Sequence, residues 1–281
     1  MDWLTFERVV FAILPDRQTL FLLGYVAIIA FFALIEARHP GFSDDSIRAK
    51  RWPTNFGIGL INLTLGVIAP VSAVIAAYWA TRNGYGLLNF ISMPWWVAAI
   101  VTVLGRSFAG YAVHFVMHKT PLLWRIHRVH HSDTQLDVST AFRSHPLEVV
   151  IVVAVTTLTA VALGMDAVVL AAYELAEAAV HIATHANLRL PERLDRALRW
   201  LFVTPNMHCL HHSAWHRETD SNYGTVFSVW DRLFGTYSAA PRAGYDAMQI
   251  GLKEIRDERA HSFVWQLKSP AWDLRPPPKQ E

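Results

Sequence analysis

The chain has 281 residues and a formal net charge of +2, and 53% of its residues are hydrophobic whereas only 17% are charged. This composition is too apolar for an ordinary soluble domain, and the near balance of charge excludes the clustered basic surface that nucleic acid binding requires. A single cysteine, Cys209, excludes an internal disulfide and a zinc site built from several thiolates.

The first 180 residues contain four apolar segments with the length that a membrane helix needs, about 20 residues. The segments are 19–35, 52–81, 82–117, which contains Arg106, and 149–180. The last of them is predicted to form two shorter helices that either cross the membrane or form a hairpin. From 188 to 237 the chain becomes polar. We therefore expect an all-α fold, a multi-pass transmembrane helical bundle with a cytosolic helical cap.

Basic residues predict which side of the membrane the loops face. Arg48, Lys50 and Arg51 lie between the first two apolar segments, whereas only Arg82 follows the second. The positive-inside rule places the Arg48 loop in the cytosol, and counting crossings onward places the histidine-rich half there too. The excess of arginine over lysine favours a bacterial source, and hence the inner cell membrane.

Twelve of the fourteen histidines lie between His114 and His216, and ten of these form four clusters that read HFVMH, HRVHH, HIATH and HCLHH. Residues three or four positions apart lie on one face of a helix, so the imidazoles of each cluster can approach a common point. The ten are His114, His118, His127, His130, His131, His181, His185, His208, His211 and His212.

Ten imidazoles exceed the roughly four ligands of a zinc site, so at least two metal ions are implied. Neutral imidazole suits iron, zinc and copper alike, and the spacing does not choose among them. Without a metal, crowded imidazoles would repel one another if protonated and would need partners if buried and neutral.

Other kinds of histidine-rich membrane protein fit these clusters less well. A dizinc hydrolase would normally add carboxylate ligands and a general base. A metal-binding or transport protein would place its ligands at mid-membrane, whereas these clusters lie near predicted helix ends. A bis-histidine haem carrier would leave HRVHH and HCLHH unexplained.

The motifs taken in order resemble the fatty acid hydroxylase superfamily, which includes sterol desaturases, sphingolipid hydroxylases and alkylglycerol monooxygenase. The resemblance covers residues 53–237 and rests on HFVMH, LWRIHRVHHSDTQLDVSTAFRSHPLE, HIATHANLRLP, TPNMHCLHHS and DSNYGTVFSVWDRLFGTY. It implies a membrane-bound oxidoreductase in which the ten clustered histidines hold two iron ions. Dioxygen would be the co-substrate, and the product a hydroxylated or desaturated sterol, fatty acyl or sphingolipid chain.

With this family in view the chain divides into four parts. We expect an N-terminal interfacial segment (1–18), transmembrane helices (19–106), a fatty acid hydroxylase-like catalytic region (107–240) and a C-terminal tail (241–281).

Polar residues near the clusters are expected to support the ligands, because a ligating histidine usually donates its second N–H to a carboxylate or carbonyl. The candidates are His145, Glu174, Glu177, Asn187, Asn206 and Asp231, together with Asp133, Asp137 and Asn222. Glu177 and Glu174 lie about one and two turns before His181 in an apolar segment, where ionisable groups are costly and tend to be functional. His145 is expected to be either a ligand or a supporting residue.

The sequence HPG at His39, Pro40 and Gly41 resembles part of the haem-binding HPGG motif of cytochrome b5, but the second glycine is missing. We therefore expect a separate electron donor, a ferredoxin or cytochrome b5 with its reductase. The other expected partners are a lipid substrate and the membrane.

Overall fold

The computed structural model describes residues 17–42, 47–68 and 72–274. Within these ranges every regular element is a helix, and strand pairing is limited to three isolated bridges. The predicted all-α class is thus confirmed for the described residues. The predicted interfacial segment 1–18 lies outside them except for its last two residues, which begin the first described helix.

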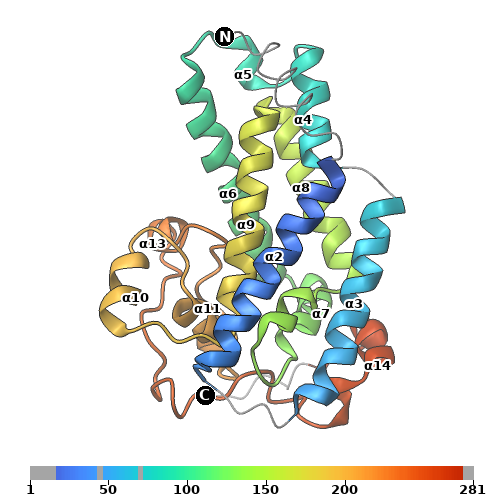
Figure 1. Ribbon diagram of the computed structural model, residues 1–281, viewed down its shortest axis with the longest axis vertical. Coiled ribbons are helices and arrows are strands. Elements are labelled where there is room, and N and C mark those ends of the chain that lie inside the picture. The colour runs from blue at the N-terminus through green and yellow to red at the C-terminus, as the bar shows by residue number, and fades with distance from the viewer. Residues whose placement is uncertain (1–16, 43–46, 69–71, 275–281) are drawn as a thin grey trace.

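Six helices form an elongated bundle, and most of the remaining helices gather at one end of it (Figure 1). The bundle contains α2 (Arg17–Arg38), α3 (Arg48–Ile68), α4 (Ala73–Arg82), α6 (Trp95–Lys119), α8 (Pro146–Leu163) and α9 (Ala167–His185). The short helices at that end are α7 (Pro121–His131), η1 (Val138–Phe142), α10 (Glu192–Leu198), α11 (Pro205–His211), α12 (His216–Thr219), α13 (Val229–Leu233), η2 (Glu258–His261), α14 (Phe263–Lys268) and η3 (Ser269–Ala271). Helix α5 (Leu87–Phe90) lies at the opposite end.

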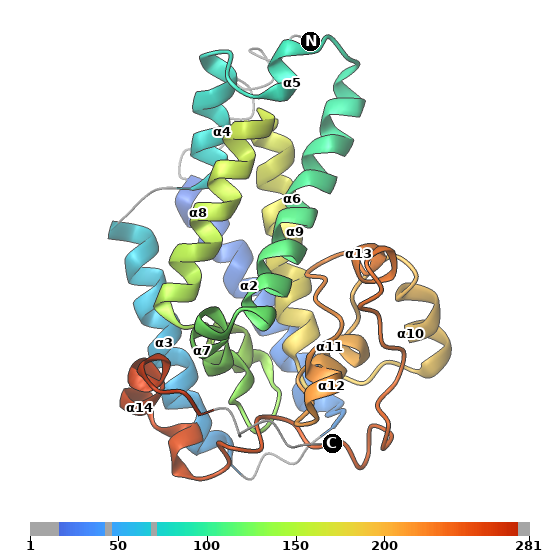
Figure 2. The same cartoon turned by 180° about the vertical axis from the view of Figure 1, so that it is seen from behind.

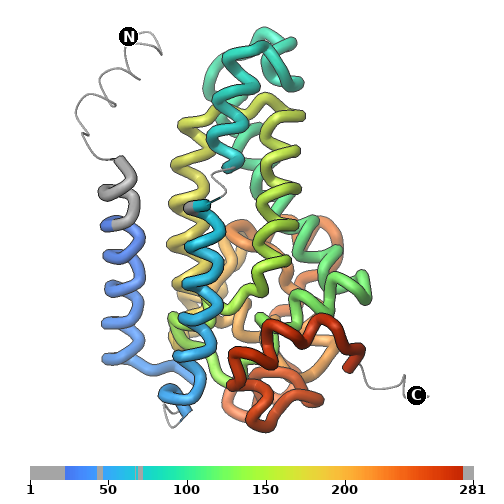
Figure 3. The backbone as a smooth tube through the Cα atoms, turned by 90° about the vertical axis from the view of Figure 1, so that its right-hand side faces the viewer, coloured from blue at the N-terminus to red at the C-terminus, as the bar shows by residue number. Residues whose placement is uncertain are grey.

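Three of the described helices, α6, α8 and α9, are long and apolar enough to cross a membrane. The predicted segment 149–180 is two separate helices, which Gly164 divides in the left-handed conformation at φ 66°. The predicted segment 52–81 is also divided, since α3 ends at Ile68 and α4 begins at Ala73. Figure 3 shows these two helices one above the other along the bundle.

Small residues bring the bundle helices close together. Ala73 and Ala77 of α4 are buried in one cluster with Ala160 of α8, and such small side chains allow close approach between membrane helices. Outward, α8 exposes large apolar side chains such as Leu158, which is 69% exposed. Apolar residues on an outer face suit contact with lipid chains.

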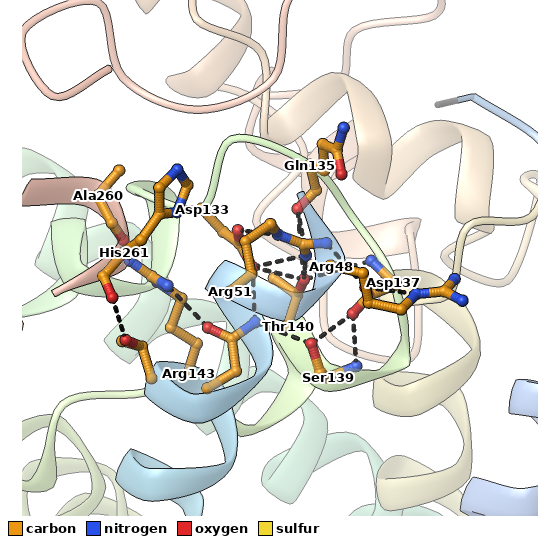
Figure 4. Close-up of polar contacts among 12 residues, drawn as sticks. Arg48, Arg51, Asp133, Gln135, Asp137, Ser139, Thr140, Arg143, Ala260 and His261 are labelled. Carbon is orange, nitrogen blue, oxygen red and sulfur yellow. Dashed lines mark hydrogen bonds and ion pairs between the residues drawn. The ribbon is translucent and has the colours of Figure 1, made fainter. Parts of the chain in front are cut away.

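A buried network of charged and polar side chains joins α3 to the loop that follows α7 (Figure 4). Arg51 of α3 is 1% exposed, and its Nε lies 2.5 Å from Asp133 Oδ1 and its Nη1 2.8 Å from Asp137 Oδ2. Burial alone would raise the pKa of Asp133, but the charges of Arg51 and Arg143 outweigh it and hold that pKa well below its usual range. The network therefore keeps Asp133 ionised inside the protein.

The chain after residue 240 returns to the same end of the bundle. Leu252, Ile255 and Ala260 pack with Trp124 of α7, and Arg128 Nη2 donates to the carbonyl oxygens of Ser269 and Trp272, each at 2.6 Å. The predicted tail thus covers α7 as far as the described residues extend.

We predict that replacing Arg51 with leucine lowers the free energy of unfolding by about 3–5 kcal/mol, because a buried carboxylate then loses its main counter-charge. Unfolding by heat or denaturant in detergent measures this loss. The matched control is Lys50→Gln, since the pair of Lys50 with Glu258 has side chains that are 58% and 80% exposed. That change should cost less than about 1 kcal/mol, and equal losses in the two variants would contradict the assigned role of Arg51.

Candidate metal centre

Nine of the ten clustered histidines meet in two groups at the end of the bundle where the short helices gather. The first group is His114, His118, His127, His131 and His211, and the second is His130, His185, His208 and His212. Within each group the possible ligand atoms all lie within 4.8 Å of one another. Figure 2 shows α7 and α11 near the lower ends of α6 and α9, which carry the other members.

Helix geometry explains why neighbouring histidines enter different groups. Residues four positions apart point the same way, whereas adjacent residues are rotated by about 100°. His127 and His131 of α7 therefore join the first group, and His130 turns to the second. In each of the adjacent pairs His130–His131 and His211–His212, one ring joins the first group and the other joins the second. The clusters HRVHH and HCLHH therefore each contribute to both groups.

Backbone carbonyls fix the tautomer of three ligand rings. His114 Nδ1 lies 2.8 Å from the carbonyl oxygen of Tyr223, and His211 Nδ1 lies 2.6 Å from that of Ser221. His185 Nδ1 lies 2.7 Å from the carbonyl oxygen of His181. A carbonyl only accepts hydrogen bonds, so each Nδ1 carries the proton and each neutral ring directs an unprotonated Nε2 inward.

The second group brings its Nε2 atoms into direct proximity. His185 Nε2 lies 2.9 Å from His130 Nε2 and 2.9 Å from His208 Nε2, and His208 Nε2 lies 3.2 Å from His212 Nε2. His185 cannot donate through Nε2 while its proton is on Nδ1. A cation between these nitrogens would accept the lone pair that His185 directs at its neighbours.

The first group fits a metal for the same reason. The Nε2 atoms of His114, His118 and His211 are buried without a hydrogen-bond partner within the described residues. Unpartnered buried polar atoms are costly. The donor set is all imidazole, which suits iron, zinc or copper, so the side chains present fit a bound transition metal in each group.

Two carboxylates stand behind ligands of the first group. Glu148 Oε1 lies 3.0 Å from His127 Nδ1, and Asp220 Oδ1 lies 3.3 Å from His118 Nδ1. A carboxylate behind a ligating histidine orients the ring and makes it a stronger donor to a metal. Glu148 and Asp220 both lie where such a carboxylate would act.

Burial keeps these imidazoles neutral. It is the largest cause that lowers the pKa of His130, His131, His208 and His212 well below the usual value, and the neighbouring histidines lower it further. Burial also lowers the pKa of His211 to about 3. Neutral imidazole is the form that binds metal.

His181, the tenth predicted ligand, lies beside the second group and outside both sets of converging nitrogens. Its Nε2 is 3.1 Å from the carbonyl oxygen of Ala141, and its ring centroid is 4.3 Å from that of His185. His181 therefore contacts the ring of His185 and the carbonyl oxygen of Ala141 in η1.

Two of the predicted supporting residues, Glu174 and Glu177, face another helix of the bundle. Glu177 Oε2 lies 2.5 Å from Arg106 Nη2 of α6, and Glu174 Oε1 lies 3.7 Å from Arg106 Nε. Thr225 also donates to Glu177, at 2.9 Å. These carboxylates form an ion pair network within the bundle.

Asp231 supports a ligand through the backbone. Its carboxylate accepts hydrogen bonds from the backbone N–H groups of Tyr223 and Gly224, at 2.7 and 2.9 Å. The carbonyl of Tyr223 in turn holds His114. Asn222 has a positive φ of 57° in the same turn, and its Nδ2 donates to the carbonyl oxygen of Met207 at 3.2 Å.

The other predicted supporting residues tie chain segments together near the histidines. Asn206 pairs with both backbone groups of Leu190, and Asn187 accepts from Gly41 and Phe42. His145 caps α8 by accepting from Leu147 N–H, and its Nε2 lies 3.1 Å from the carbonyl oxygen of Leu267. Asp133 and Asp137 belong to the Arg51 network.

Sequence reasoning did not single out Glu148, Asp220 or the carbonyls of Ser221 and Tyr223. Glu148 could have been noticed as a charge at the start of the apolar run of α8. The carbonyls carry no signal in the sequence, because every residue has one.

Three membrane-length helices and two groups of converging imidazoles define an all-helical protein with a histidine-rich candidate metal centre. Residues 99–236 match the family model described as fatty acid hydroxylase. An ornithine lipid hydroxylase from Rhizobium tropici is 28% identical over 92% of this chain and 78% of its own length.

Alkylglycerol monooxygenases provide a second set of relatives. Those of Xenopus tropicalis and Homo sapiens are 28% and 27% identical over 67% and 73% of this chain. The alignments span less than half of those proteins, 42% and 43% of their lengths. No solved structure matches the chain. The predicted resemblance is confirmed: the region 99–236 belongs to the fatty acid hydroxylase family.

We predict that the metal-free protein loses stability as the pH falls below about 6.5, the value at which unfolded histidines take up protons. In the folded protein His211 takes up a proton only near pH 3. Between these values the unfolded chain binds more protons, so acidification favours unfolding. Melting temperatures in detergent with a chelator, measured from pH 8 to pH 5, test this. In His211→Gln the melting temperature should depend less steeply on pH. A melting temperature independent of pH in the unaltered protein would contradict the conclusion that the buried rings are neutral.

Proposed function

We propose that the protein is a membrane-bound, dioxygen-dependent di-iron oxidoreductase that hydroxylates or desaturates a C–H bond of a lipid. The observation that carries this proposal is the pair of adjacent all-histidine groups. Two groups of five and four imidazoles suit two metal ions, as the sequence predicted.

The relatives support iron rather than zinc. Their names describe a lipid hydroxylase and monooxygenases, and oxygenation of a C–H bond needs a metal that changes its oxidation state. Zinc does not do so. When bound, a pair of iron ions would supply the redox chemistry that activates dioxygen.

The protein's own residues would hold and orient this centre. Nine histidines would be the ligands, and His181 would pack beside them as a supporting residue. The Tyr223 and Ser221 carbonyls keep protons on Nδ1, and Glu148 and Asp220 stand behind two further rings. Burial of nearly all these side chains keeps bulk water from the site, as chemistry on an unactivated C–H bond requires.

The position of the site favours a lipid substrate. His114 and His118 lie near the end of α6 and His185 ends α9, and both helices have membrane length. A long-chain substrate held in the bilayer could therefore reach the site without leaving an apolar environment. Sterol, fatty acyl and sphingolipid substrates are all compatible with this arrangement.

We also propose that the histidine groups face the cytosol of a bacterial cell, within the inner membrane. Arg48 and Lys50, at the start of α3, lie at the same end as the histidines, which agrees with the positive-inside rule. Electrons would come from a separate ferredoxin or cytochrome b5 with its reductase.

The predicted division into domains stays a proposal. The family match at 99–236 supports a catalytic region at 107–240.

The deciding experiment is metal analysis combined with lipid oxidation, with dioxygen and an added ferredoxin and reductase, on detergent-purified protein expressed with iron and zinc both available. We expect about two iron ions per chain, because the histidines form two groups. His131→Ala and His130→Ala should each lose about one ion, since each removes a ligand from a different group. Both variants should lose dioxygen-dependent oxidation of a lipid extract.

His181→Ala is the matched control, because its Nε2 faces a carbonyl oxygen, and it should retain about two ions. Stoichiometric haem, zinc in both groups or no bound metal would contradict the proposal. Loss of a metal ion in His181→Ala would show that His181 is itself a metal ligand.

A further inference from the structure

A second candidate site lies apart from the histidine groups, in a surface cavity of about 1000 Å³. It is lined by the segment that follows α2, by helix α10 and by the segments around Trp200 and Tyr237. Four arginines contribute, Arg189, Arg196, Arg199 and Arg232, against two carboxylates, those of Glu192 and Asp195. The lining is therefore positively charged.

Arg232 is the arginine whose charge is least balanced. Arg199 pairs with Asp195, Arg196 with Glu192 and Arg189 with Asp246. Arg232 forms no ion pair with any residue that the structure describes. Aromatic rings hold it instead, since its guanidinium carbon lies 3.9 Å from the ring centroid of Tyr237 and 4.8 Å from that of Trp200.

Arg232 can offer donors to a ligand in the cavity. Its Nη2 donates to the backbone carbonyl oxygen of Arg199 at 2.9 Å, its Nη1 has no hydrogen-bond partner among the described residues, and the side chain is partly exposed. The Nε atoms of Arg199 and Arg232 also lack a partner in the described part of the chain, but they are buried and do not reach the cavity. Guanidinium groups with spare donors are a usual recognition site for phosphate.

Exposed apolar side chains lie next to the lining residues in the chain. Trp200, which lines the cavity, is 70% exposed, and Leu201 and Leu233, which follow Trp200 and Arg232, are 50% and 67% exposed. Helix α13, which carries Arg232, lies against α6 (Figure 2), and Trp230 Nε1 donates to Ser107 Oγ of α6 at 2.9 Å. Exposed tryptophan beside arginine is typical of a membrane interface.

We propose that this cavity binds the phosphate group of an anionic phospholipid, with Arg232 as its main contact and Arg196 as a second. The exposed apolar side chains would lie in the interface, where the acyl chains of that lipid extend away from the cavity. A free phosphate would use the same arginines but would gain nothing from the exposed Trp200, Leu201 and Leu233. The site is independent of the metal chemistry proposed above.

The test uses the metal-loaded protein in a nonionic detergent, titrated with dioleoylphosphatidylglycerol in mixed micelles while the melting temperature is recorded. We expect the melting temperature to rise with this lipid, because a ligand of the folded state stabilises it. Dioleoylphosphatidylcholine should give little shift. In Arg232→Gln the apparent affinity for the anionic lipid should fall by about tenfold, as expected for one lost charge-assisted contact.

Two further variants keep the test decisive. Arg196→Gln alters an exposed member of the cavity, so it should weaken the lipid effect without threatening folding. Arg193→Gln, an exposed arginine of α10 outside the lining, should respond like the unaltered protein. Metal content should be unchanged in all three.

Equal shifts with both lipids, or an unchanged response in both cavity variants, would overturn the proposal. A third titration uses inorganic phosphate in place of the lipid. A rise in melting temperature with millimolar phosphate that is as large as with the lipid, and that Arg232→Gln abolishes, would overturn the lipid as the source of the anion.

Discussion

Nine buried imidazoles converge on two neighbouring points, and the rest of the structure depends on how this convergence is held. In the second group, imidazole nitrogens lie 2.9–3.2 Å apart, close enough for one cation to join them. Carbonyls and carboxylates behind the rings direct the unprotonated nitrogens inward. The centre is therefore organised for metal by its surroundings as well as by its ligands.

Charged side chains away from the site hold the ligand helices in place. Arg143 donates to the carbonyl oxygen of Val129 at 2.9 Å and to Ser132 Oγ at 3.0 Å, on either side of His130 and His131. Arg143 also reaches Asn55 of α3, which donates to Asp133 at 2.9 Å. Breaking this frame would move the adjacent rings of His130 and His131, which belong to different groups. Stability and the geometry of both histidine groups are thus coupled through the end of α7.

The sequence was sufficient for the helical class, for the family and for nine histidines that the structure brings together, because helical spacing places residues four apart on one face. It did not reveal that each His-His pair divides between two groups, since this depends on how α7 and α11 are oriented against α6 and α9. Nor did the sequence reveal that Glu174 and Glu177, predicted as supporting residues, pair with Arg106 of another helix. The carbonyl partners of His114 and His211 follow from tertiary folding alone.

The most direct test of a centre made of two imidazole groups is X-ray absorption at the iron edge of the purified, iron-loaded protein. We expect light-atom ligands with the outer scattering of four to five imidazoles per ion, as the two groups provide, and scattering from a second iron nearby. Sulfur ligands, a porphyrin pattern or an isolated iron with few imidazoles would contradict it.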